Sequence, residues 1–82
     1  MEAANIETRV RSVIAQVFSL RPEDVTPDVK LGNPPAWDSM GHMELLVAVE
    51  NEFGVRFRAH DIANLTNVPA IAAAVLANGT GR

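Results

Sequence analysis

The stretch from residue 21 to residue 36, RPEDVTPDVKLGNPPA, holds four of the five prolines in the 82-residue chain. Proline inside an α-helix removes a backbone hydrogen bond and clashes with the preceding turn, so no continuous helix can run through this stretch. We expect a long crossover loop that Val25, Leu31 and Trp37 anchor to the core. A connection this long is uncommon in a small domain unless it serves a function.

The residues before this loop predict a first amphipathic helix. Asn5 is its expected N-cap, and Arg21-Pro22 is its expected end. Its apolar side chains recur with a period of about 3.6 residues. They are Ile6, Val10, Val13, Ile14, Val17 and Phe18.

The residues after position 58 predict two further helices. HDIANL, residues 60–65, is a short helical turn at most, and residues 66–78 form the final helix. Thr66 or Asn67 is expected to cap this helix, Pro69 lies in its first turn, and NGTGR ends it. Its expected buried stripe consists of Val68, Ile71, Val75 and Leu76.

Together with a central helix in residues 36–55, these segments predict an all-α fold. We expect one domain, residues 1–82, folded as a small antiparallel bundle of three main helices and a short third helix. The chain has no cysteine, so a compact aliphatic core must stabilise it without disulfides. No apolar run is long enough to span a bilayer and no signal peptide is visible, which predicts a soluble, cytoplasmic protein without a membrane partner.

The acidic residues are concentrated in the central helix. The net charge is −3, and residues 38–55 contain Asp38, Glu44, Glu50 and Glu52 but no base. A nucleic-acid binder needs a basic surface, so nucleic acid is excluded as a partner. The acidic helix predicts partners with basic surfaces, although a solvated acidic face without any partner is the alternative.

This helix is apolar on two sides. Projected at about 100° per residue, one stripe contains Leu45, Leu46, Val49 and Phe53 and is the expected core face. A second cluster contains Met40, Met43 and Val47, flanked by Glu44 and Glu50. Either the long loop buries this second cluster, or it is an exposed docking surface with an acidic rim. Methionine is suited to a docking surface because its side chain adapts to different partners.

Ser39 lies at the entrance of this second cluster. A serine at a helix start is commonly an N-cap, but His42 occupies the position where a capping box would have Glu or Gln. Asp38 can cap the helix as well, which would leave Ser39 at the first helical position with its hydroxyl pointing outward. A phosphate attached there would be stabilised by the free N–H groups and the dipole of the helix N-terminus.

The segment WDSMGHMELLVAVENEFGV, residues 37–55, resembles the signature of acyl carrier proteins, in which an Asp-Ser-Leu/Met element heads the second helix. The similarity extends along nearly the whole chain, from the first helix and the long loop to the capped last helix. The resemblance implies that Ser39 carries covalent 4′-phosphopantetheine, transferred from coenzyme A by a separate Mg²⁺-dependent transferase. It implies a monomeric carrier of acyl or aminoacyl thioesters, not an enzyme, with no catalytic residue and no metal site.

The same resemblance implies which proteins bind the carrier. They are the phosphopantetheinyl transferase, an acyl- or aminoacyl-loading enzyme, and a downstream synthase or transferase. Their expected contact residues are Asp38, Met40, Met43, Glu44 and Val47.

Two features differ from the fatty-acid carriers of this family. Those carriers commonly have an acid two residues after the serine, where this chain has Gly41, and they lack the NPPAW insert before Asp38. These differences favour a role in polyketide or related natural-product biosynthesis. A housekeeping fatty-acid carrier is the alternative, and an unmodified helical interaction domain is the alternative from another class.

Two chemical readings of the same residues are disfavoured. A hydrolase would require Asp38, Ser39 and His42 to act together, but Asp38 directly precedes Ser39 and cannot readily also orient the far nitrogen of His42. A metal site using His42 and His60 lacks a recognisable ligand spacing. We expect His42 to be a partly buried ring that packs on the long loop and shares one hydrogen bond.

Overall fold

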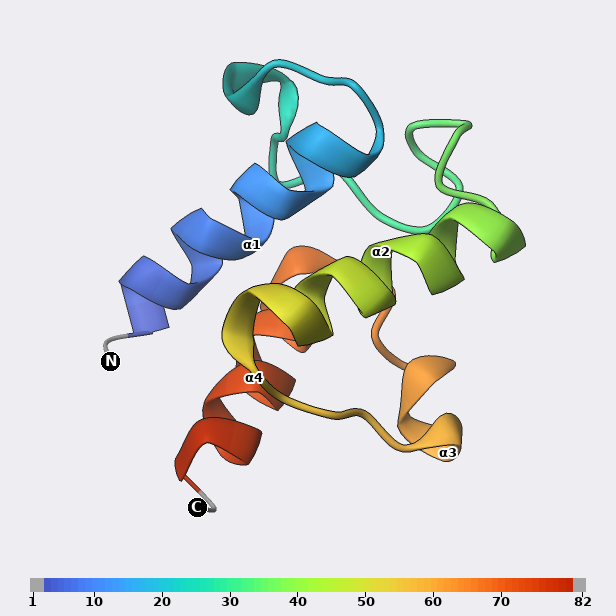
Figure 1. The fold of residues 1–82 in the computed structure, drawn as a ribbon. Helices are drawn as coiled ribbons and strands as arrows, with labels where there is room; N and C mark the ends of the chain where they lie inside the picture. Colours follow the sequence, from blue (N-terminus) through green and yellow to red (C-terminus); the bar gives the residue numbers. More distant parts are fainter. Residues whose placement is uncertain (1–2, 81–82) are drawn as a thin grey trace.

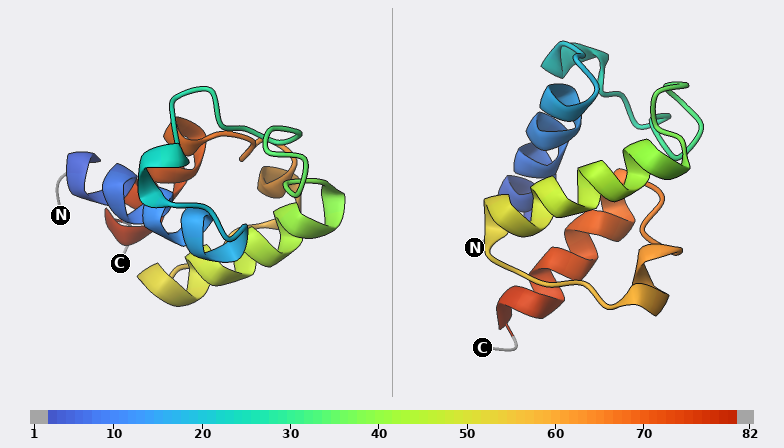
Figure 2. Two further views of the ribbon diagram at one scale, coloured as in Figure 1. Left: turned by 90° about the horizontal axis from the view of Figure 1, so that it is seen from above. Right: turned by 45° about the vertical axis from the view of Figure 1, so that its right-hand side comes forward.

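The computed structural model describes residues 3–80, and these residues form an all-α fold. Its helices are α1 (Ala3–Val17), α2 (Ser39–Phe53), α3 (Ala59–Ile62) and α4 (Val68–Thr80), and the short 3-10 helix η1 (Pro22–Asp24) lies in the long loop (Figure 1). α1 packs against both α2 and α4, which run against its direction, and α3 lies to one side (Figures 1 and 2). The predicted fold class is therefore confirmed.

The first helix differs from the prediction at both ends. α1 begins at Ala3, so Asn5 lies inside the helix and the predicted N-cap is wrong. The helix ends at Val17, before Arg21, because Ser19 adopts the left-handed conformation (φ 56°) and the N–H of Leu20 donates to the Ala15 carbonyl at 2.8 Å. The predicted apolar side is otherwise correct, since Ile6, Val10, Val13 and Ile14 are buried, and Val17 and Phe18 pack against the core.

The long loop is anchored by two of the three predicted residues. Val25 and Trp37 are buried, but Leu31 is 38 % exposed, and Val29 is the third buried anchor. The backbone explains the error, because the N–H of Leu31 donates to the Thr66 carbonyl at 2.9 Å and Lys30 pairs with Asn67. The loop is thus attached to the α3–α4 connection by its backbone at this point, and the Leu31 side chain is left exposed.

The last helix has the predicted cap and a later end. The side chain of Asn67 accepts a hydrogen bond from the N–H of Ala70 at 2.9 Å, so Asn67 rather than Thr66 caps α4. Val68, Ile71 and Val75 are buried as predicted, and Leu76 is partly buried. α4 continues to Thr80, so the predicted stop at NGTGR is wrong within the described part, and residues 81–82 lie outside it. Glycine weakens a helix by about 1 kcal/mol but does not forbid it.

The three long helices enclose one aliphatic core that includes Trp37 of the loop. Between residues 3 and 80, no helix has both the length and the apolar character that crossing a membrane requires.

Candidate functional site

The first turn of α2 is fixed by Asp38. This residue is the N-cap with an extended backbone, and its Oδ1 accepts a hydrogen bond from the N–H of Gly41 at 2.8 Å. Ser39 consequently occupies the first helical position, as the sequence predicted, and it is exposed. Within the part of the chain that the structure describes, its hydroxyl has no hydrogen-bond partner. The site therefore presents an accessible hydroxyl at a helix N-terminus.

The glycine two residues after Ser39 has a structural cause. A Cβ atom at Gly41 would collide with the carbonyl oxygen of Ala36 and would also crowd the Phe18 ring and the Asp38 carboxylate. The long loop thus returns so closely to α2 that only glycine fits without a shift of the backbone. A side chain at this position, an acidic one included, would force the loop or the helix to shift.

His42 lies behind this turn and is buried at 6 % exposure. Its Nδ1 accepts a hydrogen bond from Nε1 of Trp37 at 2.9 Å, and its Nε2 lies 2.8 Å from the carbonyl oxygen of Ile62. The indole N–H can only donate and the carbonyl can only accept, so the ring is the neutral Nε2–H tautomer. The predicted contact with the loop is confirmed, but the ring makes two hydrogen bonds rather than one, and the second reaches α3.

Trp37 is fully buried between two other rings. Its centroid lies 5.7 Å from that of Phe18 and 6.1 Å from that of His42. The loop before Ser39, the end of α1 and the start of α2 are therefore held together by one aromatic cluster.

These contacts argue against nucleophilic catalysis. Both nitrogens of His42 are bonded to Trp37 and Ile62, and the Asp38 carboxylate caps the helix, so neither residue is arranged to activate Ser39. Among the residues covered by the structure, no group of three or more His, Cys, Asp or Glu could hold a metal ion.

The second apolar cluster of α2 is exposed. Met40, Met43 and Val47 are 75 %, 48 % and 52 % exposed, and we call them the exposed strip. The alternative that the long loop buries them is wrong. The opposite side of the helix, with Leu45, Leu46 and Val49, is fully buried in the core. α2 therefore has one face that stabilises the fold and one that is open to solvent.

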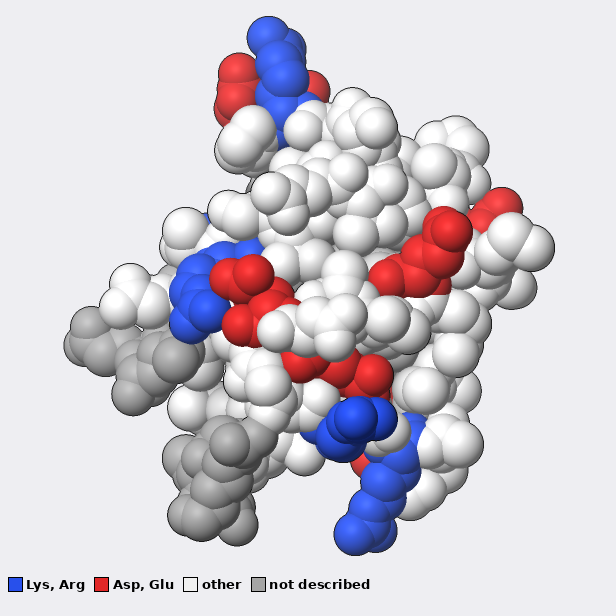
Figure 3. Space-filling model, in the orientation of Figure 1, with Lys and Arg blue, Asp and Glu red and all other residues white. Residues whose placement is uncertain are grey.

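Acidic side chains border the exposed strip. Figure 3 shows Asp and Glu side chains in a band along α2, with uncharged surface between them and basic side chains at its edges. Glu44 is exposed beside the strip, and Asp38 is exposed at the N-terminal end of α2. At the other end, Glu52 forms an ion pair of 3.1 Å with Arg9, which joins the end of α2 to α1.

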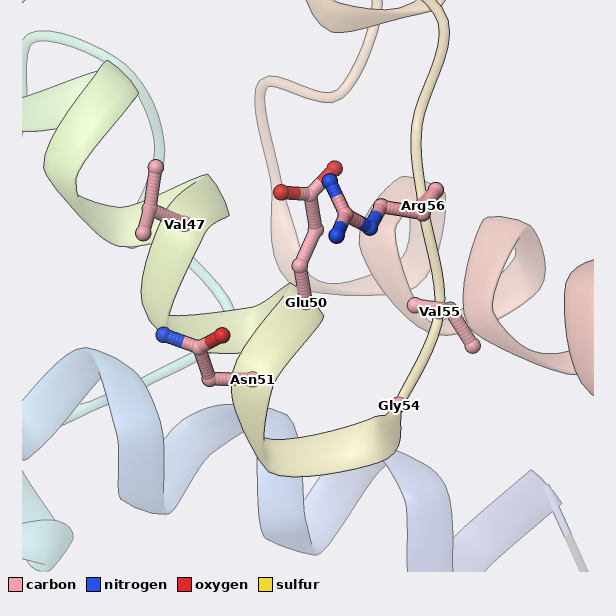
Figure 4. Close-up of a pocket in the computed structure, with 6 residues that line it drawn as sticks. All are labelled: Val47, Glu50, Asn51, Gly54, Val55 and Arg56. Carbon is pink, nitrogen blue, oxygen red and sulfur yellow. The ribbon is translucent and has the colours of Figure 1, made fainter.

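A shallow groove of about 530 Å³ continues the exposed strip at the C-terminal end of α2 (Figure 4). Val47 belongs to both the strip and the groove, and the side chains of Glu50 and Arg56 extend into it from α2 and from the following loop. The remaining lining residues are Asn51, Gly54 and Val55. The sequence pattern did not predict this groove, although Val47, Glu50 and Gly54 share one helical face.

The site thus combines an exposed hydroxyl at the head of α2 with an open apolar face on the same helix. The family model described as "Phosphopantetheine attachment site" matches residues 8–75 of this chain. The chain belongs to this family of phosphopantetheine-bearing carriers.

Two relatives are both acyl carrier proteins. The protein from Thermosynechococcus vestitus is 31 % identical over 68 residues, covering 83 % of this chain and 84 % of the relative. The protein from Buchnera aphidicola subsp. Baizongia pistaciae is 33 % identical over 67 residues, covering 82 % and 86 %. The chain is accordingly an acyl carrier protein, a carrier rather than an enzyme, with covalently attached 4′-phosphopantetheine.

A solved structure agrees with the fold. The acyl carrier protein from Enterococcus faecalis superposes with a TM-score of 0.71 at 23 % sequence identity, covering 95 % of this chain and 99 % of that chain. At this identity the likeness concerns the fold alone.

The first turn of α2 fits the phosphate of the prosthetic group. The hydroxyl of Ser39 is accessible, and the N–H groups and dipole of the helix N-terminus stabilise negative charge. Oδ1 of Asp38, the nearest acid in sequence, already accepts the hydrogen bond from Gly41. The thiol at the end of the group supplies the thioester chemistry when cargo is attached.

Proposed function

We propose that Ser39 is the attachment point of 4′-phosphopantetheine and that the chain, residues 1–82, acts as a single monomeric carrier domain. The observation that carries this proposal is the exposed, unpartnered Ser39 hydroxyl at the first position of α2. The family match supports it, since residues 8–75 include this turn. A separate transferase supplies the group from coenzyme A, and we place the carrier in the cytoplasm with that donor.

The carrier needs no base or nucleophile of its own beyond the Ser39 hydroxyl. The acyl or aminoacyl cargo is held as a thioester, and tethering raises its effective concentration at the active site of each partner enzyme. A buried histidine bonded to Trp37 and Ile62 suits this role, because a free base beside the thioester would favour its hydrolysis.

We propose that partner enzymes bind Asp38, Met40, Met43, Glu44 and Val47. The partners are the phosphopantetheinyl transferase, an acyl- or aminoacyl-loading enzyme and a downstream synthase or transferase. The exposed strip offers apolar contact, and its acidic rim steers partners that carry basic residues around an apolar centre. A small surface of this kind binds weakly, which allows each partner to leave after its reaction.

For the pathway, we propose polyketide or related natural-product biosynthesis. The support is the path of the long loop, which requires Gly41 where fatty-acid carriers commonly have an acid. A housekeeping fatty-acid carrier is the alternative, and the mass of the cargo on protein isolated from its cells decides between them.

Carriage of a thioester can be tested directly. Protein modified with an acylated coenzyme A and a broad-specificity transferase should gain one acyl-phosphopantetheine group in its intact mass. Neutral hydroxylamine should then remove the acyl group, because it cleaves thioesters, and should leave the phosphopantetheine attached. A chain that gains no mass, or whose acyl group resists hydroxylamine, contradicts the proposal.

The exposed strip can be tested with Met43→Gln, which keeps the length of the side chain and removes its apolar end. Because Met43 is half exposed, the free energy of unfolding should change by less than about 0.5 kcal/mol. The kcat/KM of the transferase should fall about tenfold, equivalent to ~1.4 kcal/mol of lost interaction.

The matched control is Gln16→Met, an exposed position on α1, which should change neither quantity. A Met43→Gln variant that is modified at the normal rate would remove Met43 from the partner-binding surface. A loss of several kcal/mol in stability would instead show that Met43 belongs to the core.

A further inference from the structure

His42 connects two segments that lie far apart in the sequence. Through Nδ1 it is bonded to Trp37, five residues earlier, and through Nε2 to the carbonyl of Ile62, twenty residues later. Among the buried residues that the structure describes, His42 alone has an ionisable side chain. A buried polar side chain is normally hydrogen-bonded, so bonding alone is no surprise. The two partners lie in different segments, one in the loop before α2 and one at the end of α3.

The Trp37 bond fixes the segment that contains Ser39. The carbonyl of Trp37 accepts from Gly32 at 2.7 Å and its N–H donates to Pro34 at 2.9 Å, so the loop holds its backbone in place. At the other end of the segment, the N–H of His42 donates to the Asp38 carbonyl at 2.7 Å. The Trp37–His42 bond joins the two ends of this short segment, and Ser39 lies between them in the sequence.

The Ile62 bond holds α3. This helix is a single turn of four residues, and its N-cap, Arg58, makes no side-chain capping bond. A helix of this length is unstable by itself and needs tertiary contacts. Ile62 is half-buried, and its carbonyl at the C-terminal end of α3 accepts from both Leu65 and His42. α3 is therefore attached to α2 at the turn that presents Ser39.

We infer that His42 is a positioning residue that couples the Ser39 turn (residues 37–42) to α3, so that the two segments open together as one local unit. Proteins open locally in such cooperative units, with free energies below that of global unfolding. If Ser39 carries the arm, as proposed above, a partner that displaces α3 also changes how Ser39 is presented, and the reverse holds by linkage.

Two substitutions separate the two bonds of His42. The Oδ1 of an asparagine stands close to the position of Nδ1 and can accept from Trp37, whereas the asparagine is too short to reach Ile62. The Nε2 of a glutamine stands close to the position of the ring Nε2 and can donate to the Ile62 carbonyl. His42→Asn thus keeps the Trp37 bond, and His42→Gln keeps the Ile62 bond, while both remove the ring that stacks on Trp37.

The test is amide hydrogen exchange on the unmodified protein at a temperature where all variants are folded. Coupling predicts that each variant speeds exchange about tenfold in both residues 37–42 and residues 59–65, and less in α4. Val49→Ala is the matched control, because it weakens the core from the same helix and leaves both bonds intact. It should speed exchange everywhere to a similar degree.

Fluorescence supplies a second readout, since Trp37 is the only tryptophan and the chain has no tyrosine. Coupling predicts that Ile62→Ala, which weakens the packing of α3 and leaves the His42 ring stacked on Trp37, shifts the Trp37 emission. The inference is overturned if His42→Gln, which keeps the Ile62 bond, leaves exchange in residues 59–65 unchanged, or if exchange rises equally throughout the chain. Both readouts use protein without the arm, so they are independent of whether Ser39 is modified.

Discussion

Trp37→Ala should lower the free energy of unfolding by about 3–5 kcal/mol, the usual cost of removing a large aromatic side chain from a core. Trp37 is fully buried and packs between Phe18 and His42. The substitution also leaves Nδ1 of His42 without its donor, which adds to the loss. For a domain whose total stability is about 5–15 kcal/mol, this is a large fraction of the free energy of unfolding. Urea unfolding followed by far-UV circular dichroism measures the change.

Trp37→Phe is the control for this prediction. It keeps an aromatic ring in the core and removes the N–H donor and part of the ring volume, so the loss should be smaller, about 1–3 kcal/mol. A Trp37→Ala variant that loses less than 1 kcal/mol would contradict the role of Trp37 as the anchor of the long loop.

Ser39→Ala should abolish modification by the transferase. The variant should fold normally, because Asp38 rather than Ser39 caps α2 and the Ser39 hydroxyl has no partner within the described residues. Its stability should therefore change by less than about 0.5 kcal/mol. Intact mass after incubation with coenzyme A and transferase should show no added phosphopantetheine.

Ser12→Ala is the matched control on α1. Ser12 is also an exposed helical serine, and its hydroxyl donates to the Thr8 carbonyl at 3.2 Å. This variant should gain the same mass as the unaltered protein. If Ser39→Ala still gains one phosphopantetheine, the group is attached elsewhere.

The two faces of α2 could be predicted from the sequence because both are local patterns. Helical periodicity alone separates Leu45 and Val49, which are buried, from Met43 and Val47, which are exposed. Periodicity does not say whether a loop covers the second face. Whether it does depends on the path of residues 21–36. In the structure this loop packs on the core through Val25 and Val29 and leaves the strip exposed.

The contact of His42 with Ile62 and the groove could not be predicted in this way. The partner atom on Ile62 is a backbone carbonyl, which every residue has, so no sequence pattern marks it. Leu31 shows the converse, because its apolar character predicted burial, whereas backbone bonds to Thr66 hold its turn at the surface. The predicted start of α1 and the predicted end of α4 were wrong for a related reason. Neither Asn5 nor Gly79 is incompatible with a helix, so the helices extend beyond them.

The presentation of Ser39 thus depends on residues that have no chemical role. Asp38 caps the helix, Gly41 lets the loop approach, and the Trp37–His42 pair holds the turn from behind. The Ser39 side chain itself is exposed.

The most direct measurement is tandem mass spectrometry of protein isolated from its own cells, with fragmentation that locates the added group along the chain. We predict one phosphopantetheine, with or without an acyl cargo, on Ser39 and on no other residue. A phosphopantetheine found on Ser12, Ser19 or a threonine, with Ser39 unmodified, would contradict the proposed attachment site.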